Sequence, residues 1–142
     1  MFIFLLMLSA ACCSLVWAAM VFFELRPPTV QFLLSGEHIG QQKMLRITAA
    51  DEQRGLRRFS IAVLQGTKRI LLFDEQLGCA GLMEGGASRS KTVSLELKPR
   101  QLGLENGPAK LEATVWDYAL SHWGRGNAAT LSRDIVIDLI VP

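Results

Sequence analysis

Charged side chains are absent from the first 23 residues of the 142-residue chain, which read MFIFLLMLSAACCSLVWAAMVFF. An apolar run of this kind is set apart before the fold of the remaining residues is considered. As a helix it would extend about 35 Å at ~1.5 Å per residue, compared with about 30 Å for the hydrocarbon core of a bilayer. The run is therefore long enough to span a membrane.

The uncharged run predicts a retained membrane anchor, although a cleaved signal peptide is an open alternative. Signal peptides have a basic N-terminal segment and an apolar core of about 7–15 residues, whereas the first basic residue here is Arg26. Small residues at Val16, Ala18 and Ala19 do resemble a cleavage site. Arg26, read by the positive-inside rule, slightly favours a domain that stays inside. We nevertheless expect an uncleaved transmembrane signal anchor over residues 1–24 and an exported domain, because an N-terminal anchor before a compact β domain is typical of exported proteins.

Cysteine is scarce, and the part of the chain beyond the anchor contains only Cys79. No disulfide can form within the domain, so its stability must come from its core. No histidine lies near Cys79 in the sequence, which favours a buried or inert thiol over a nucleophile. Cys12 and Cys13 raise the question of a lipoprotein signal, but Ser9 or Ala10 stands where such a signal requires leucine. Unmodified thiols are the better interpretation.

Histidine is also scarce, because the chain contains only His38 and His122. A zinc site normally needs three or four converging ligands, so these two would need Asp51 or Asp117 as well. A calcium site is a further alternative, because carboxylates at strand ends gather at one pole of many sandwiches. Its ligands would be Asp51, Asp117, Asn127 and Asp138. Without a dense acidic motif, these side chains are better explained as turn caps, and we predict neither a metal nor a cofactor.

Charge of either sign is not in excess, since 15 Lys and Arg residues face 13 Asp and Glu residues, all beyond the uncharged run. The two signs are interspersed, as on an ordinary solvated surface. Nucleic-acid binding depends on a basic surface that neutralises phosphates. The sequence therefore predicts no nucleic-acid partner.

Alternating apolar and polar residues recur after the anchor, and no stretch there has a convincing helical period. The paired prolines of ELRPPTV predict an extended spacer over residues 25–28. Seven stretches are expected to be strands: 29–34, 43–51, 56–66, 68–73, 92–98, 109–117 and 133–142. The intervening residues 35–42 read as a polar loop, and residues 74–91 as a long loop or irregular edge. We predict an all-β, immunoglobulin-like antiparallel sandwich of about seven strands over residues 29–142, preceded by one transmembrane helix.

The stretch WDYALSHWGRGNAAT, residues 116–130, separates the last two expected strands. We interpret it as a packed loop in which Asp117 accepts hydrogen bonds from backbone amides, while Gly124 and Gly126 supply left-handed backbone. The alternative is a stacking platform for a sugar or a peptide. Its candidate ligand-binding residues are Trp116, Tyr118, Trp123 and Arg125. The sequence offers no candidate catalytic residue.

Three segments together resemble the N-terminal part of bacterial M23-family (LytM-type) peptidoglycan endopeptidases. They are ITAADEQRGLRRFSIAVLQG, KPRQLGLENGPAKL and LEATVWDYALSHWGRGNAATLSRDIVIDLIVP. The most specific part is the GRGN stretch, with a D before it and a D and a P after it. In that family, a transmembrane segment leads into an immunoglobulin-like domain, and a zinc peptidase domain follows. The resemblance covers residues from about 28 to 142. It implies a single-pass protein of the bacterial inner membrane with its domain in the periplasm.

The zinc ligands of that family come from an H-x-x-x-D motif and an H-x-H motif, and neither is present here. Gln42 occupies the fourth position after His38, and Gly124 occupies the second position after His122. No metal ligand can be transferred from the family to this chain. We therefore expect a non-catalytic envelope domain, an accessory or targeting module of a peptidoglycan-processing peptidase.

Two other interpretations remain open at this stage. The chain would be a truncated fragment of a zinc metalloendopeptidase if the DNA after the codon for Pro142 encodes the missing motifs. It would be a carbohydrate- or peptide-binding module if the aromatic loop forms a platform. The expected partners are the membrane, through the N-terminal helix, and peptidoglycan or other envelope proteins.

Overall fold

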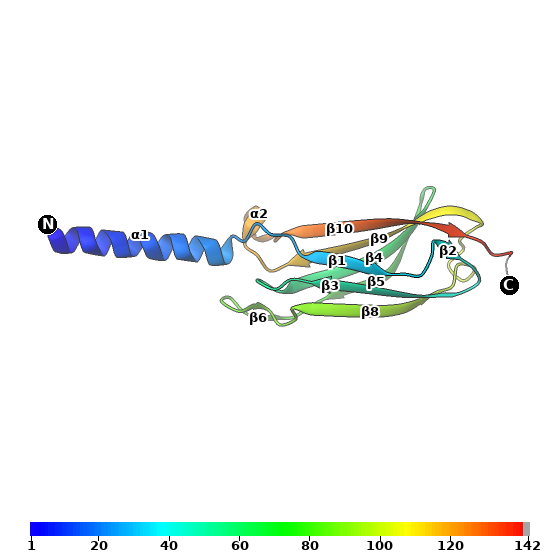
Figure 1. Ribbon diagram of the computed structural model, residues 1–142, viewed down its shortest axis with the longest axis horizontal. Helices are drawn as coiled ribbons and strands as arrows, with labels where there is room; N and C mark the ends of the chain where they lie inside the picture. Colours follow the sequence, from blue (N-terminus) through cyan, green and yellow to red (C-terminus); the bar gives the residue numbers. More distant parts are fainter. Residues whose placement is uncertain (141–142) are drawn as a thin grey trace.

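The computed structural model describes residues 1–140, which form one long helix followed by a β-sandwich (Figure 1). Helix α1 (Phe2–Phe22) leaves the sandwich at the end that carries the short helix α2 (Ser121–Gly124). Strand β2 (His38–Ile39) lies at the other end of the sandwich (Figure 1). We call these two ends the anchor pole and the distal pole.

Helix α1 is long and apolar enough to cross a membrane, and none of its side chains is buried against the domain. Its 21 residues correspond to about 31 Å at ~1.5 Å per residue, close to the thickness of a hydrocarbon core. The hydroxyl groups of Ser9 and Ser14 donate to the carbonyls of Leu6 and Ala10, each at 2.9 Å. These two polar side chains are therefore satisfied within the helix, as a lipid environment requires.

The described residues contain ten strands, of which seven have at least five residues. The seven long strands are β1 (Thr29–Leu33), β3 (Lys43–Ala50), β4 (Leu56–Gln65), β5 (Lys68–Gln76), β8 (Ser90–Leu97), β9 (Gly107–Asp117) and β10 (Ala128–Ile137). The short strands are β2 (His38–Ile39), β6 (Cys79–Gly81) and β7 (Gly85–Gly86). All seven expected strands are present, although several boundaries differ.

The long strands form two sheets with the order β1-β3-β8 and β2-β10-β9-β4-β5. Pairing is antiparallel throughout both sheets except between β2 and β10, which are parallel. Counted along the chain, the first, second and fifth long strands make one sheet, and the other four make the second. In immunoglobulin-type sandwiches the strands divide in this way when the fourth strand joins the larger sheet. The predicted immunoglobulin-like all-β sandwich with one N-terminal helix is confirmed.

The alternation of apolar residues produces the core between the two sheets. The inward residues of the three central strands are buried: Leu45, Ile47, Ala49, Phe59, Ile61, Val63, Leu111, Ala113 and Val115. At the distal pole, Leu104 is also buried and Leu102 packs against the same cluster. These two leucines close one end of the core.

The expected loops contain more regular structure than the sequence indicated. Strand β10 begins at Ala128, five residues before the expected start, because it continues to pair with β9 as far as Trp116. Within the expected loop 74–91, strands β6 and β7 form a small separate hairpin. The expected polar loop 35–42 contains β2, whose Ile39 is fully buried. A single apolar residue among polar ones has no periodicity, so pattern reasoning could not identify this strand.

The burial of Ile39 gives a test of strand β2. We expect Ile39→Ala to lower the free energy of unfolding by about 2–5 kcal/mol, because it removes fully buried methyl groups and leaves a cavity. Met44→Ala, an exposed position on β3, is the matched control and should have little effect. Chemical denaturation of the full chain in detergent micelles measures both. Equal stability of the two variants would show that β2 does not contribute to the core.

Candidate functional site

The segment between β9 and β10, residues 118–127, forms a tight loop at the anchor pole, and we call it the helical loop. Four of its residues have left-handed backbone, with φ values of 53° at His122, 60° at Trp123, 77° at Gly124 and 80° at Gly126. A Cβ atom at position 126 would lie 2.3 Å from the carbonyl oxygen of Asp117, so only glycine fits there. The two glycines behave as the sequence predicted, whereas the left-handed His122 and Trp123 were not expected.

The carboxylate of Asp117 organises the helical loop from within. It is fully buried, and its Oδ1 accepts hydrogen bonds from the backbone amides of Ala119 at 3.0 Å and Asn127 at 2.7 Å. Its Oδ2 accepts a hydrogen bond from the Asn127 side-chain amide at 2.9 Å. The Ser121 hydroxyl donates to the Asn127 Oδ1 at 2.9 Å. The predicted turn-capping role of Asp117 is therefore confirmed, and Asn127 is its main partner.

The same asparagine fastens the end of helix α1 to the sandwich. Asn127 Nδ2 donates to the backbone carbonyls of Glu24 at 2.8 Å and Arg26 at 3.3 Å. The backbone amide of Leu120 donates to the carbonyl of Phe22, the last helical residue, at 2.7 Å. We call these contacts, between residues 22–26 and the helical loop, the anchor junction. The expected spacer 25–28 is therefore hydrogen-bonded to the domain at Arg26, its second residue.

Arginine side chains hold the other loops of the anchor pole. The guanidinium of Arg54 donates to the carbonyls of Leu82 at 2.9 Å and Met83 at 3.0 Å, in the hairpin formed by β6 and β7. It also lies 5.3 Å from the centre of the Phe22 ring, a cation–π contact. Arg54 therefore links the hairpin directly to the end of α1. The equivalent contacts of Arg89 reach backbone carbonyls of the β3–β4 turn and the hairpin.

Arg57 holds the helical loop because of an irregularity in strand β4. The pairing of β4 with β9 skips Arg57, which lies between the paired residues Leu56 and Arg58. A residue that is left unpaired in this way can be re-aimed away from the strand. The Arg57 guanidinium donates to the carbonyls of Gly124 and Arg125. A β-bulge thus turns a strand residue into a support for the loop.

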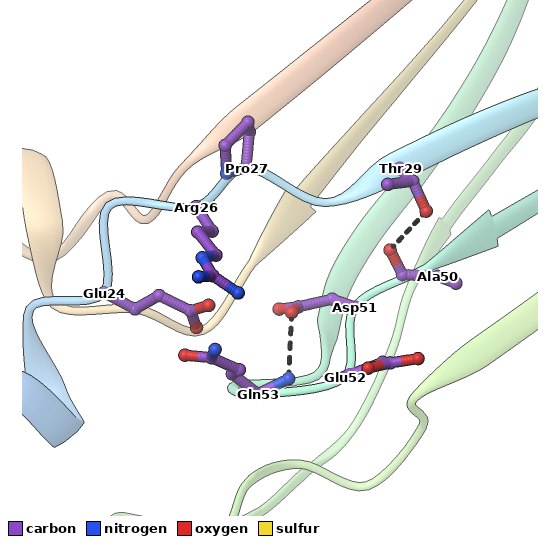
Figure 2. A pocket seen from close by; sticks show the side chains of 8 residues that line it. All are labelled: Glu24, Arg26, Pro27, Thr29, Ala50, Asp51, Glu52 and Gln53. Carbon is purple, nitrogen blue, oxygen red and sulfur yellow. Dashed lines mark hydrogen bonds between the residues drawn. The ribbon is translucent and has the colours of Figure 1, made fainter.

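Figure 2 shows a pocket of about 200 Å³ beside the anchor junction. Its lining residues are Glu24, Arg26, Pro27, Thr29, Ala50, Asp51, Glu52 and Gln53. The carboxylates of Glu24 and Asp51 point toward one another across it, and the Arg26 side chain extends toward them (Figure 2). Both acids are only 6% exposed, and one oxygen of each has no hydrogen-bond partner in the protein. Buried carboxylates without full hydrogen bonding favour the protonated form.

Burial raises the pKa of Glu24 to about 7, and the negative charges of Asp51 and Asp117 add to the effect. The positive charges of Arg26 and Arg54 oppose this rise but do not cancel it. Burial also raises the pKa of Asp51, against a hydrogen bond from the Gln53 amide that lowers it. Glu24 therefore exchanges its proton near neutral pH, which makes the anchor junction sensitive to pH.

The structure places two of the four candidate ligand-binding residues in one pocket. Trp116 and Arg125 line an open pocket of about 450 Å³ on the outer face of the larger sheet, next to Arg57 and His122. Trp116 is half-buried rather than freely exposed, because the Arg58 guanidinium lies 5.1 Å from its ring centre. The pocket combines one aromatic face with cationic groups, a combination that suits an anionic or sugar-like ligand.

Tyr118 and Trp123 lie apart from that pocket. The Tyr118 hydroxyl donates to the Leu77 carbonyl at 2.6 Å, and its ring packs against Gly86, so this side chain is structural. Trp123 is completely exposed and does not line the pocket. A single four-residue platform is therefore not formed.

The residues considered for metal binding do not all come together, although Asp117 and Asn127 are in contact. His38 lies in β2 at the distal pole and His122 at the anchor pole, so they cannot share an ion (Figure 1). Asp138 follows β10 at the distal pole, away from Asp51 and Asp117. Within residues 1–140, no group of three or more His, Cys, Asp or Glu side chains is arranged to hold a metal ion.

The expectation for Cys79 was a buried or inert thiol, and burial is wrong, because the side chain is exposed at the start of β6. Its Sγ lies 3.2 Å from the Gly85 carbonyl oxygen, within the small hairpin. No apolar periodicity surrounds Cys79 from which its exposure could have been predicted. Its exposure follows from the hairpin, which extends beyond the packed sheets.

Sequence reasoning missed Glu24 and Arg54, two charged residues that the fold buries at this pole. Glu24 falls inside the expected anchor 1–24, but α1 ends at Phe22, so Glu24 belongs to the anchor junction. Charged residues are rarely buried unless they are paired, and nothing in the local sequence signals that these two are. The one indication in the sequence was the pair of prolines at 27 and 28, because a helix usually ends before a proline and Glu24 lies only three residues upstream.

No family model matches the chain, and no curated protein matches it in sequence. Among solved structures, the endo-beta-1,4-mannanase from Thermotoga petrophila is similar with a TM-score of 0.51 and 12% identity, over 82% of this chain and 21% of that chain. A beta-glucosidase from Listeria innocua has a TM-score of 0.48 and 10% identity, over 80% and 16% of the two chains. The sulfur carrier protein SoxY from Chlorobium limicola has a TM-score of 0.42 and 10% identity, over 90% and 99%.

These similarities concern the fold alone. This chain spans about a fifth of the mannanase and less of the beta-glucosidase, so it matches one part of each enzyme. At 12% identity, a shared sandwich carries no statement about activity.

The raised pKa of Glu24 predicts how stability depends on pH. Between about pH 4.5 and pH 7 the native state binds more protons than the unfolded state, so the free energy of unfolding falls as the pH rises through this range. We expect Glu24→Gln, which cannot ionise, to be more stable than the parent at pH 8 by roughly 3 kcal/mol, and similar to it below pH 4.5.

Chemical denaturation of the full chain in detergent micelles at several pH values measures this difference. Glu37→Gln, an exposed position at the distal pole, is the matched control and should follow the parent. A Glu24→Gln variant with the same pH dependence as the parent would show that Glu24 ionises normally.

Proposed function

We propose that this chain is a non-catalytic, membrane-anchored module of the bacterial cell envelope that positions peptidoglycan-processing machinery of the M23 type. The observation that carries this proposal is the anchor junction. Backbone carbonyls immediately after the membrane-spanning helix are hydrogen-bonded to a buried side chain of the sandwich. A domain joined in this way is held at a fixed place against the bilayer, whereas a flexible linker would let it move freely.

The proposed location is the inner membrane, crossed once by α1, with the sandwich in the periplasm. The length of α1 supports a single crossing, and its helix continues without interruption past Val16, Ala18 and Ala19. We propose that the anchor is retained in the mature protein. The absence of a disulfide within the domain is compatible with this location, because the two sheets share a continuous apolar core.

The proposed partner class is peptidoglycan or a protein that processes it. Support for this partner comes from the resemblance of the three quoted segments to the domain that precedes the peptidase in M23 enzymes. The sandwich extends away from the membrane along its long axis, with the distal pole farthest from α1 (Figure 1). It would therefore act as a spacer and a contact surface between the bilayer and the cell wall.

Direct binding of a cell-wall fragment is a second candidate function, favoured by the pocket that contains Trp116 and Arg125. The aromatic ring can stack on a sugar face, and the guanidinium can pair with a carboxylate of a peptide. His122 and Arg57 add further polar groups at the same place. This candidate differs from the first because it needs the pocket and not only the anchor.

Co-sedimentation with purified sacculi tests both candidates. We expect the full chain in detergent micelles to sediment with sacculi and to release no muropeptides, with or without added zinc. Arg125→Ala should weaken sedimentation severalfold if the pocket binds the wall, because it removes an exposed cation without touching the core. Met44→Ala, exposed on β3 and away from the pocket, is the matched control.

Each outcome bears on a different part of the proposal. Zinc-dependent release of muropeptides would overturn the non-catalytic assignment. A full chain that does not sediment would remove peptidoglycan as the direct partner. Sedimentation that is unchanged in Arg125→Ala would remove the pocket as the binding site.

A further inference from the structure

Besides Phe23 and Leu25, which directly follow α1, three large apolar side chains of the sandwich are exposed at the anchor pole. Trp123 projects completely from the helical loop. Leu82 and Met83, in the hairpin between β6 and β7, are 68% and 54% exposed. Exposed apolar groups that gather on one side of a domain mark an interaction surface rather than ordinary surface variation.

Both segments that carry these side chains are tied to the level of Phe22, where α1 ends. The helical loop is joined there by the hydrogen bond from the Leu120 amide to the Phe22 carbonyl, three residues before Trp123. The hairpin is joined through Arg54, which binds the carbonyls of Leu82 and Met83 and stacks on the Phe22 ring. Figure 1 shows α2 and the β6 hairpin beside the end of α1.

The length of α1 fixes where Phe22 lies in a bilayer. At ~1.5 Å per residue, the 21 residues of α1 span about 31 Å, which is the thickness of the hydrocarbon core. Phe22 then lies at the boundary of the hydrocarbon, and the headgroup layer of about 5–7 Å begins there. Any side chain held at the level of Phe22 and directed outward along the membrane meets this layer.

The local backbone supports an outward position of Trp123. His122 and Trp123 both adopt left-handed backbone, which is strained for a residue other than glycine. Such strain persists only when the surrounding contacts impose it. Here those contacts are the hydrogen bonds of Arg57 to the carbonyls of Gly124 and Arg125. The loop is thus held in a strained form that leaves a tryptophan in contact with no other part of the domain.

We propose that the anchor pole docks on the lipid surface of the membrane that α1 spans, with Trp123 and the tip residues Leu82 and Met83 inserted at headgroup depth. This inference rests on the membrane-anchored state proposed above. Tryptophan favours the membrane–water interface because its ring is apolar and its N–H can donate a hydrogen bond to water or a headgroup. Leucine and methionine contribute apolar area to the same insertion.

Charge makes a smaller contribution to this docking than apolar insertion. Arg26 and Arg125 are exposed at this pole and can approach anionic headgroups. Glu52 and Glu84 are exposed at the same pole and oppose that attraction. The docking therefore depends on the three apolar side chains and should change little with ionic strength.

Together with α1, contacts of the helical loop and of the hairpin with the membrane would fix the orientation of the sandwich. A single spanning helix can rotate and tilt, since its tilt is set by its neighbours and its interfacial anchors. Contacts by the helical loop on one side of α1 and by the hairpin at a second place would restrict both motions. The pocket at Trp116 would then face a constant direction along the membrane.

Fluorescence quenching by brominated lipids tests the insertion directly. The full chain is reconstituted in liposomes with Trp17→Phe and Trp116→Phe, so that Trp123 is the only tryptophan. Two further chains carry Trp17→Phe, Trp116→Phe and Trp123→Phe. One of them adds Leu82→Trp and the other adds Met44→Trp, so that each has a single tryptophan. Met44 is an exposed apolar residue of β3 near the distal pole, and Met44→Trp is the matched control.

We expect bromine atoms placed near the headgroups to quench Trp123 and Leu82→Trp severalfold more than Met44→Trp. Emission from Trp123 should also be blue-shifted relative to the same chain unfolded in urea. If Trp123 and Leu82→Trp are quenched no more than Met44→Trp, the docking inference is wrong. If Trp116→Phe disturbs the fold, the same three chains are prepared with Trp116 retained. The quenching of Trp123 and of Leu82→Trp is then compared with that of Met44→Trp against the common contribution of Trp116.

Extraction of the liposomes at alkaline pH separates this inference from the proposed function. A chain that resists extraction but shows no quenching of Trp123 keeps its anchor and lacks the docking. A chain that is extracted has no spanning anchor, and both proposals then fail together. Quenching that disappears in high salt would overturn the assignment of docking to apolar insertion.

Discussion

The buried hydrogen-bond network of Asp117 and Asn127 is the interaction on which the anchor pole depends. One carboxylate accepts the amides that close the helical loop, and one side-chain amide reaches from that carboxylate to the backbone beyond the membrane helix. A buried charge of this kind is stable only when its hydrogen bonds are satisfied, and removing a single partner would expose the full cost of desolvation. The loop, the end of β9 and the exit of α1 therefore form one unit and not three adjacent segments. The Asn127 side-chain oxygen also accepts a hydrogen bond from the Ser121 hydroxyl, which further restricts the conformation of this side chain.

Arginine side chains take the structural role that disulfides have in many exported sandwiches. Arg54, Arg57 and Arg89 each bind at least two backbone carbonyls in loops that have no regular pairing of their own. The planar guanidinium suits this task because it offers several donors in a fixed geometry. Arg57 can do so only because the irregular pairing of β4 with β9 releases it from the strand. At the anchor pole, the loops are thus held by arginine side chains that donate to backbone carbonyls. The apolar side chains of Trp123, Leu82 and Met83 are exposed.

The sequence was informative where periodicity was strong and uninformative where single residues decide the structure. Alternation in β3, β4 and β9 identified the core face correctly, and the uncharged N-terminal run identified the helix. Ile39, Glu24 and Arg54 were missed because each is one residue whose burial depends on contacts distant in sequence. Of the four residues of the candidate platform, Trp116 and Arg125 share a pocket, and their binding of a ligand stays a prediction. Tyr118 and Trp123 diverge from it because the helical loop turns through four left-handed residues, two of which no glycine rule could have identified.

If the anchor pole docks on the membrane as proposed, the buried acid and the exposed tryptophan at this pole would be linked through the membrane surface. Glu24 lies two residues beyond the end of α1, so it stands at the depth at which Trp123 would meet the headgroups. An anionic lipid surface concentrates protons and so raises the apparent pKa of a nearby group. Since burial and the charges of Asp51 and Asp117 already bring Glu24 to about 7, docking on such a surface would favour its protonated form further. By linkage, protonation of Glu24 and docking on an anionic surface would then favour one another, because each lowers the cost of the buried acid. The junction would be most stable when the pole rests on the bilayer.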